Sequence, residues 1–361
     1  MVQSVFERDA AGKIAPGPAV LSLFRKDGNQ FTEERILDPE SNVFHKAMPF
    51  EGGILTVGGE QAIVKKWTHD GAKWNGKTLW QRKWDGKFNR MRDVALGDLT
   101  GDGQDEMVIA THDMGVVGVG VKKEGTWAFT EYGLVADTFV HEVEIGDLEG
   151  DGKMEFYVTP SERNRANLTA QPGGVVRYDF QDGSFVSSRV AQWFDTHAKE
   201  ITVSKVGGEK SRLFAVKEAS KTQPVQVVEL TKGPDGWQES VLVSLSGEKQ
   251  ARFLVVGDCD HDGAEEMVIA GMNTGLWLLD KDENEKWTVK IIDGTSGGFE
   301  QATHLADLDG DGKIEIYVAS EKKGQPRQLR QYRWDGEHFQ RNVIATLEGM
   351  GLVWNLQDGV F

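Results

Sequence analysis

A nine-residue acidic segment recurs four times in this chain, and it restricts the possible folds more than any other feature. Each copy starts with Asp, carries oxygen-bearing side chains at positions 3, 5 and 9, and has Gly at position 6. The copies are DLTGDGQDE (98–106), DLEGDGKME (147–155), DCDHDGAEE (258–266) and DLDGDGKIE (307–315). An apolar run of strand length follows each copy. Such self-similarity indicates a repeat protein, in which neighbouring units cover one another.

A tight turn followed by an aromatic residue forms a second, independent repeat. The turn is of the DG or EG form in all but one case, where the sequence is DENEK. Such turns between apolar runs predict β-hairpins, and we interpret the aromatic side chains as packing within and between the units. The seven aromatic residues are Phe31, Trp74, Trp127, Phe185, Trp237, Trp287 and Phe339.

Together the two repeats predict an all-β, seven-bladed propeller of four-stranded blades, forming one domain over residues 1–361. The last unit is incomplete, because GLVWNLQDG provides an inner strand near Leu352 and the chain then ends. Segments 19–28 and 31–37 near the N-terminus can supply its two outer strands. We therefore expect one blade built from about 349–361 plus 1–44, which closes the ring. A six-bladed ring with a stray hairpin and an open solenoid are the alternatives.

The acidic loops suit a hard cation. Calcium takes six to eight oxygen ligands, and alternate residues of a tight loop can converge on one ion, whereas magnesium demands stricter octahedral geometry. Solvated acidic turns are the alternative, but carboxylates gathered so closely would repel one another without a cation. We therefore predict about four calcium ions, one in each loop. The expected ligands, including the backbone carbonyl at position 7, are Asp98, Thr100, Asp102, Gln104 and Glu106; Asp147, Glu149, Asp151, Lys153 and Glu155; Asp258, Asp260, Asp262, Ala264 and Glu266; and Asp307, Asp309, Asp311, Lys313 and Glu315.

Loops of the form D-x-D-x-D-G-x-x-E between two strands resemble the VCBS or FG-GAP repeats of integrin α-subunit propellers, some lectins and a fungal sugar dehydratase. The resemblance implies a calcium-binding propeller and says little about function. The units that start at His45 and His197 depart from the loop pattern and should hold no calcium there. Because such repeats usually lie outside the cytosol, the resemblance implies a secreted, periplasmic or lipid-anchored protein whose signal is absent from this chain.

Charge and hydropathy exclude several classes of partner. The formal net charge is −16, and no basic block offsets it, so nucleic acid is not an expected partner. We find no run of eighteen apolar residues, so no transmembrane segment is expected. Cys259 is the single cysteine, which rules out an intrachain disulfide framework. We expect a monomer.

Function is expected on the face opposite the acidic loops, which we call the top face. The longer connections (161–174, 217–225 and 320–328) and the starts of the inner strands share this face. A ring of His and Arg there would focus positive potential in an acidic protein and favour an anionic ligand such as a uronate. The candidate ligand-binding residues are His45, Lys46, Arg92, His141, Glu142, His197, Lys199, Glu200, Arg252, Gln301 and His304.

Three readings of this ring remain open. The first is a binding module for a glycan, an anionic ligand or a protein. The second is a lyase, dehydratase or isomerase of acidic or oxidised sugars, with His141 or His197 as the base and Arg92 or Arg252 neutralising the developing charge. The third is a structural propeller whose half-exposed strand starts are solvated or paired. Zinc held by His45, His141 and His197 is a further possibility.

Overall fold

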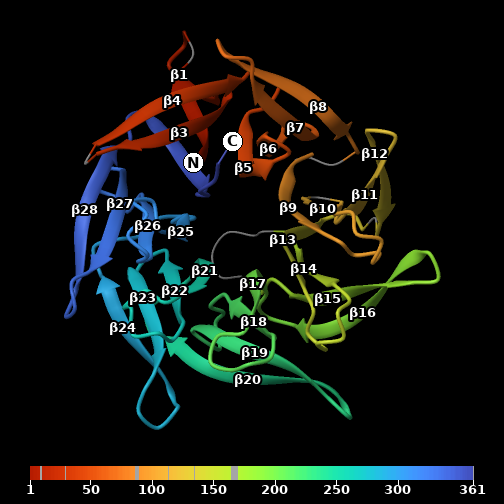
Figure 1. Cartoon of the computed structure of the whole chain (residues 1–361), viewed down its shortest axis with the longest axis vertical. Helices are drawn as coiled ribbons and strands as arrows, with labels where there is room; N and C mark the ends of the chain where they lie inside the picture. The colour runs from red at the N-terminus through yellow and green to blue at the C-terminus, as the bar shows by residue number, and fades with distance from the viewer. Residues whose placement is uncertain are drawn as a thin grey trace.

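The computed structural model describes residues 1–8, 10–28, 30–85, 89–112, 114–133, 135–163 and 170–360. These residues form seven antiparallel sheets arranged as blades around a central axis, with both chain ends in the same part of the ring (Figure 1). The predicted all-β, seven-bladed propeller is confirmed. No helix among the described residues is long and apolar enough to span a membrane.

Blades 1 to 3 follow in chain order, each from its inner to its outer strand. Blade 1 contains β5 (Val43–Phe50), β6 (Gly53–Gly59), β7 (Ala62–His69) and β8 (Trp74–Arg82). Blade 2 contains β9 (Met91–Gly97), β10 (Glu106–Thr111), β11 (Val117–Lys123) and β12 (Thr126–Tyr132). Blade 3 contains β13 (Thr138–Gly146), β14 (Glu155–Glu162), β15 (Gly173–Gln181) and β16 (Ser184–Trp193).

Blades 4 to 6 repeat this order. Blade 4 contains β17 (Ala198–Ser204), β18 (Arg212–Lys217), β19 (Val225–Gly233) and β20 (Gly236–Leu245). Blade 5 contains β21 (Ala251–Gly257), β22 (Glu266–Gly271), β23 (Leu276–Lys281) and β24 (Trp287–Asp293). Blade 6 contains β25 (Thr303–Ala306), β26 (Glu315–Ser320), β27 (Gln328–Trp334) and β28 (Phe339–Thr346).

Blade 7 combines the two ends of the chain. Its inner strand β29 pairs with β1, from Val2 opposite Asn355 to Phe6 opposite Met350, and β1 also pairs with β3 and β2. The six-bladed and open-solenoid alternatives are therefore wrong. β1 was missed in the sequence, because its apolar residues do not alternate cleanly. The strands of blade 7 are β29 (Met350–Asn355), β1 (Val2–Arg8), β2 (Ile14–Pro16), β3 (Ala19–Asp27) and β4 (Gln30–Asp38).

The hydrophobic core lies between the blades. Each of seven buried clusters joins residues of two adjacent blades, including the pair formed by blades 7 and 1. Six of the seven repeated aromatic residues belong to these clusters or pack against them, and all seven lie at the first or second position of an outer strand. Each blade therefore depends on both neighbours for burial of its apolar faces.

Removal of β29 tests the closure of the ring. Deleting residues 350–361 would expose the edge of β1 and the buried face around Val353, so we expect an aggregating or unfolded product. Deleting only 357–361 leaves β29 in place and serves as the control. Size-exclusion chromatography and thermal melting should separate the two variants. A soluble product of the longer deletion with the melting temperature of the full chain would contradict the closure.

Candidate functional site

A β-bulge interrupts the start of the inner strand in each of blades 1 to 5. In blade 1, for example, Phe44 lies opposite Gly58 and Lys46 opposite Val57, which leaves His45 as the extra residue. A bulge redirects a side chain out of the regular alternation of a strand and is frequent beside functional sites. The extra residues are His45 in blade 1, Arg92 in blade 2, His141 with Glu142 in blade 3, Lys199 in blade 4 and Arg252 in blade 5.

In blade 4 the bulge corrects our sequence alignment. His197 was aligned with the other strand starts, but it lies before β17, and Lys199 is the bulged residue. The ring therefore contains a lysine at a position where a histidine was expected, and the two side chains differ in chemistry. In blade 6 the corresponding Gln301 precedes β25 and has a positive φ of 54°.

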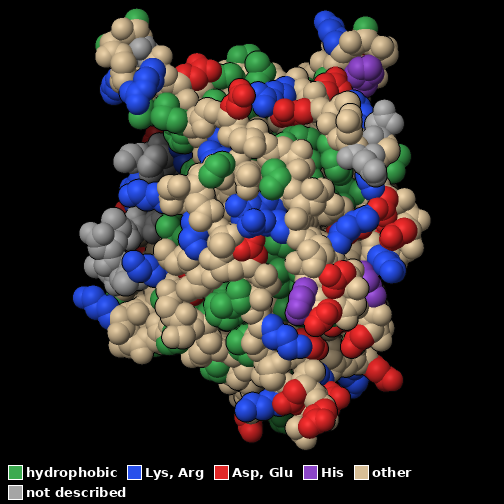
Figure 2. All heavy atoms as spheres, turned by 90° about the vertical axis from the view of Figure 1, so that its left-hand side faces the viewer, with side chains coloured by type: hydrophobic (Ala, Val, Ile, Leu, Met, Phe, Trp, Pro, Cys, Tyr) green, Lys and Arg blue, Asp and Glu red, His purple; other side chains and the backbone are tan. Residues whose placement is uncertain are grey.

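Four of the bulged residues line a common pocket of about 280 Å³ at the top face. Five lysine and arginine side chains line it. Among the described residues of the lining, Glu300 is the one acidic residue. On the side of the molecule that Figure 2 shows, in contrast, basic side chains lie among acidic ones. The lining of the pocket is therefore more basic than that side of the molecule. The lining consists of Arg90, Arg92, His112, Phe139, His141, Arg163, Lys199, Arg252, Phe299, Glu300 and Trp354.

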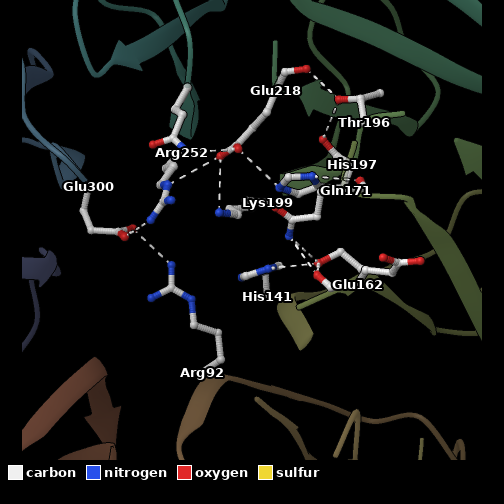
Figure 3. A network of polar contacts seen from close by, with 12 residues as sticks. Arg92, His141, Glu162, Gln171, Thr196, His197, Lys199, Glu218, Arg252 and Glu300 are labelled. Atoms are coloured by element: carbon white, nitrogen blue, oxygen red, sulfur yellow. Dashed lines mark hydrogen bonds and ion pairs between the residues drawn. The ribbon is translucent and has the colours of Figure 1, made fainter. Parts of the chain in front are cut away.

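Two buried glutamates hold the basic groups in place (Figure 3). The carboxylate of Glu300 accepts hydrogen bonds from Arg252 and, at 3.1 Å, from Arg92. Glu218 lies 3.2 Å from Nε2 of His197, 3.6 Å from Nζ of Lys199 and 3.5 Å from Nε of Arg252. The arginine side chains also lie over aromatic rings of the pocket, Arg92 at 5.4 Å from Trp354 and Arg252 at 4.0 Å from Phe299.

Several polar atoms of the pocket residues have no hydrogen-bond partner among the described residues. These atoms are Nη2 of Arg252, Nε2 of His112 and Nδ1 of His141, and all three are buried. Leaving a buried donor or acceptor unsatisfied costs roughly 1–3 kcal/mol. A ligand that bonds to these atoms would remove that cost, so they make the pocket a candidate binding site.

The electrostatics of the pocket disfavour protonated imidazole. Burial and the nearby charges of Lys199 or Arg92 hold the pKa values of His141 and His112 well below their usual range. Burial, followed by the charge of Arg252, lowers the pKa of Lys199 to about 8. Burial opposes ionisation of Glu218, but Lys199 and His197 outweigh it and lower the pKa of that carboxyl. Near neutral pH the pocket therefore contains neutral imidazoles between fixed charges.

Other predicted residues lie outside the pocket lining. His45 is buried, and its Nδ1 lies 2.5 Å from the carbonyl oxygen of Met91. Gln301 is buried and donates to Oγ of Ser296. His304 lies 2.8 Å from Asp358 and lines a separate cavity of about 350 Å³ between blades 6, 7 and 1.

The expected half-exposure of the strand starts was wrong for the three histidines. His45, His141 and His197 are each 3% exposed. Among the described residues, only side chains of two acidic loops lie close enough together to share a metal ion. The three histidines do not form such a group.

Sequence reasoning missed His112 and Glu218, which follow the second strands of blades 2 and 4. A usable signal exists, because in an antiparallel pair the end of the second strand lies beside the start of the inner strand. Thr111 is opposite Met91, for example, and Lys217 is opposite Ala198. The other missed lining residues come from two inner strands and from separate connections, which no single sequence pattern links: Arg90, Phe139, Arg163, Phe299 and Trp354.

The acidic loops share a buried glutamate at position 9. Glu106, Glu155, Glu266 and Glu315 are all buried at the start of the second strand, and burial raises the pKa of each. In the first three loops, one carboxylate oxygen of this glutamate accepts a hydrogen bond from the backbone N–H of the residue at position 2 of the same loop, at 2.8–3.4 Å. The glutamate thus fixes these three loops, and the surroundings of its other oxygen differ among the four loops.

In the third loop that other oxygen is available for a cation. Oε1 of Glu266 and Oδ1 of Asp258 are buried without a hydrogen-bond partner among the described residues. The carboxylates of Asp258, Asp260, Asp262 and Glu266 have oxygens within 4.8 Å of one another. Burial and the neighbouring aspartates raise the pKa of Glu266 to about 7. These residues fit a hard cation, which would satisfy the unpaired oxygens and relieve the repulsion.

In the second and fourth loops an arginine contacts the same glutamate oxygen. Arg177 donates to Glu155 at 2.7 Å and to Glu149 at 2.5 Å. Arg333 similarly donates to Glu315 at 2.5 Å and also contacts Asp309. Each guanidinium therefore bridges positions 3 and 9 of its loop and supplies positive charge from within the chain.

Comparison with known proteins identifies these loops. The sequence model of the FG-GAP-like repeat family matches residues 98–158 and 258–318, and each match spans two acidic loops. The chain contains FG-GAP-like repeats. No curated protein matches the chain.

Solved structures share the propeller fold at low identity. A Lactobacillus plantarum protein is 13% identical with a TM-score of 0.58, and the match covers 97% of this chain and 98% of that one. A candidate 6-phosphogluconolactonase from Bacteroides uniformis is 13% identical with a TM-score of 0.59, covering 97% of both chains. A protein of unknown function from Desulfotomaculum acetoxidans is 12% identical with a TM-score of 0.54, covering 97% and 98%. These likenesses concern the fold alone.

The inner strands of the propeller also carry an acidic cluster of Asp93, Glu142, Glu144 and Glu200. Lys46 lies 2.7 Å from Asp93, and repulsion within the cluster adds to burial in raising the pKa values of Glu142 and Glu200 well above the usual range. Three members accept a backbone N–H from the next blade: Asp93 from Val143 at 2.8 Å, Glu144 from Val203 at 3.2 Å and Glu200 from Leu254 at 3.3 Å. These hydrogen bonds link adjacent inner strands. Repulsion between the carboxylates, together with their burial, disfavours ionisation of Glu142 and Glu200.

This cluster predicts a pH dependence of stability. Burial raises the pKa of Glu144 to about 7, so the folded state favours its protonated form, and stability is lost as the pH rises from about 4.5 through 7. Relative to Glu144→Gln, the wild type should lose up to about 1 kcal/mol per pH unit in that window. Urea unfolding at about pH 5 and about pH 8 measures the difference. The exposed control Glu337→Gln should follow the wild type, and a Glu144→Gln difference that does not change with pH would contradict the assignment.

Proposed function

We propose that this protein is a binding module for an anionic ligand in the top-face pocket, with a uronate-containing glycan or another carboxylate as the ligand class. The observation that carries the proposal is the pocket's excess of basic groups in a chain of net charge −16, with five basic side chains against one carboxylate among the described residues of the lining. Concave sites with a few convergent polar groups are the usual location of small-molecule binding.

The shape and chemistry of the pocket support a compact carboxylate. Its volume of about 280 Å³ suits a small molecule or the end of a longer chain rather than a folded partner. The unpartnered Nη2 of Arg252 can donate to a carboxylate oxygen, and such charge-assisted hydrogen bonds are stronger than neutral ones. Phe139, Phe299 and Trp354 supply apolar lining next to these donors.

An enzyme acting on acidic or oxidised sugars is the second candidate. It is supported by the neutral state of His141, whose Nδ1 is unpartnered among the described residues and could accept a proton next to cationic groups. Arg92 and Arg252 would then neutralise charge that develops on the substrate. A purely structural role is less favoured, because it leaves the unpartnered buried groups unexplained.

Uronate binding tests the proposed function. Glucuronate and oligogalacturonate should bind in calorimetric titrations, whereas glucose should bind much more weakly. Arg92→Gln removes one basic group of the pocket while Arg252 still neutralises Glu300, so affinity should fall by about 10- to 100-fold, as expected for one charged hydrogen bond. Arg189→Gln, on the exposed face of β16, is the matched control. Equal affinity in both variants would contradict the proposal, and no binding of either uronate probe would exclude uronates as the ligand.

We further propose that calcium binds the FG-GAP-like loops on the opposite face and stabilises the propeller. The third loop fits best, because its carboxylates converge and two of their buried oxygens are unpartnered. Glu106 offers a similar oxygen in the first loop, where it lies 3.3 Å from the hydroxyl of Thr100. In the second and fourth loops, calcium competes with Arg177 and Arg333.

An extracytoplasmic location follows from the calcium proposal. Extracellular calcium modules bind at about 0.1–1 mM, a concentration that most cytosols do not reach. We therefore propose that the protein works outside the cytosol, where such loops would be filled.

Melting curves with and without calcium test this proposal. At ten times Kd, each site should add about 1.4 kcal/mol of stability, so millimolar calcium should raise the melting temperature above its value in excess chelator. Asp262→Asn in the third loop should reduce that rise more than Asp151→Asn at the same position of the second loop, where Arg177 already supplies positive charge. Coincident wild-type curves would exclude calcium linkage, and equal effects of the two variants would exclude the competition.

A further inference from the structure

Lys199 differs from the other basic residues of the top-face pocket in one chemical respect. The four remaining basic groups are arginines, which stay protonated in proteins, whereas a buried lysine can lose its proton. Lys199 is also the bulged residue of blade 4, so its side chain comes from the same structural position as Arg92, His141 and Arg252. Figure 3 shows it near the centre of the network, between Arg252, His141 and His197.

The surroundings of Lys199 limit how strongly its charge is compensated. Its side chain is 1% exposed, and the carboxylate of Glu218 lies 3.6 Å from Nζ while also interacting with His197 and Arg252. Burial and the positive charge of Arg252 lower the pKa of Lys199 to about 8, despite the opposing effect of Glu218. A desolvated lysine beside another cation is an activated amine nucleophile.

A second buried lysine shows what a structural ion pair looks like in this chain. Nζ of Lys65 lies 2.7 Å from Asp38 and 2.5 Å from Glu40, and it is therefore held by two carboxylates of its own. Lys199 has the longer contact to Glu218, which it shares, and it lines a pocket. A structural ion pair explains why the charge of Lys65 is buried, but it does not explain why Lys199 lines a pocket.

We propose that the amine of Lys199 forms an imine with the aldehyde or ketone group of an anionic ligand, which makes oxo-carboxylates, such as 2-oxo acids or open-chain uronates, the ligand class of this pocket. This proposal rests on the proposed anion-binding function and narrows it. The carboxylate of the ligand would be bound by Arg92 and Arg252, and the carbonyl carbon would face Nζ of Lys199.

The step balances without any further reactant. The neutral amine attacks the carbonyl carbon, a carbon–nitrogen double bond forms, and the carbonyl oxygen leaves as water with the two amine protons. Formation of the imine is reversible, so the ligand can be released by addition of water. Deprotonation of Lys199 is required first, and the cationic surroundings that bind the carboxylate also favour that deprotonation.

Reductive trapping tests the proposal. The full chain is incubated with pyruvate and cyanoborohydride at a pH close to the pKa of Lys199, digested and analysed by mass spectrometry. Cyanoborohydride delivers hydride to the imine carbon and leaves a stable secondary amine. We expect the reduced adduct on Lys199 at least about tenfold above that on the exposed Lys232, because both carboxylate binding and an activated amine favour it. Propanal, which has the carbonyl but no carboxylate, should label Lys199 less.

Two variants and one competitor separate the possible outcomes. Lys199→Arg should abolish the specific adduct, whereas Lys65→Arg should retain it. Lactate, which has the carboxylate but no ketone, should bind in calorimetry and protect Lys199 from pyruvate. If lactate binds and pyruvate labels Lys199 no faster than Lys232, the imine proposal is overturned and the anion-binding function stands. If neither lactate nor the uronate probes bind and no adduct forms, both proposals are overturned.

Discussion

Backbone pairing between β1 and β29 is the interaction on which the rest of this propeller depends. Each apolar cluster lies between two blades, so no blade has a complete core of its own. Closure by the paired chain ends gives the first and last blades a neighbour on each side and protects the edges of their sheets. The closed ring also fixes the inner strands around one axis, and it is these strands that carry the top-face pocket.

The pocket is made by a repeated irregularity rather than by a repeated motif. A bulge at the start of the inner strands of blades 1 to 5 releases one residue from the ladder, and four of these residues meet in the pocket. The repeat supplies the position, while each blade supplies a different side chain. This explains how blades of similar topology can build an asymmetric pocket rich in basic side chains.

The acidic loops and the basic pocket lie on opposite faces of the molecule. The acidic loops connect the first and second strands of a blade, and antiparallel pairing places the inner-strand starts at the other end. The acidic loops differ in how their charge is balanced, since Arg177 and Arg333 enter two of them and two oxygens of a third remain unpartnered. The proposed calcium sites and the proposed ligand site therefore lie on opposite faces, and each can be altered by substitution without touching the other.

The sequence alone determined the blade number, the acidic loops, the aromatic outer strands and the candidate ring, because each of these depends on local spacing that repeats along the chain. Tertiary structure decided the rest. Lys199 rather than His197 takes the bulged position, since a bulge depends on the register of the partner strand. His112 and Glu218 reach the site from second-strand ends, and β1 becomes a strand because β29 pairs with it. Burial of the histidines, the lowered pKa of Lys199 and the arginines inside two loops arise from contacts between segments far apart in sequence, which no local spacing records.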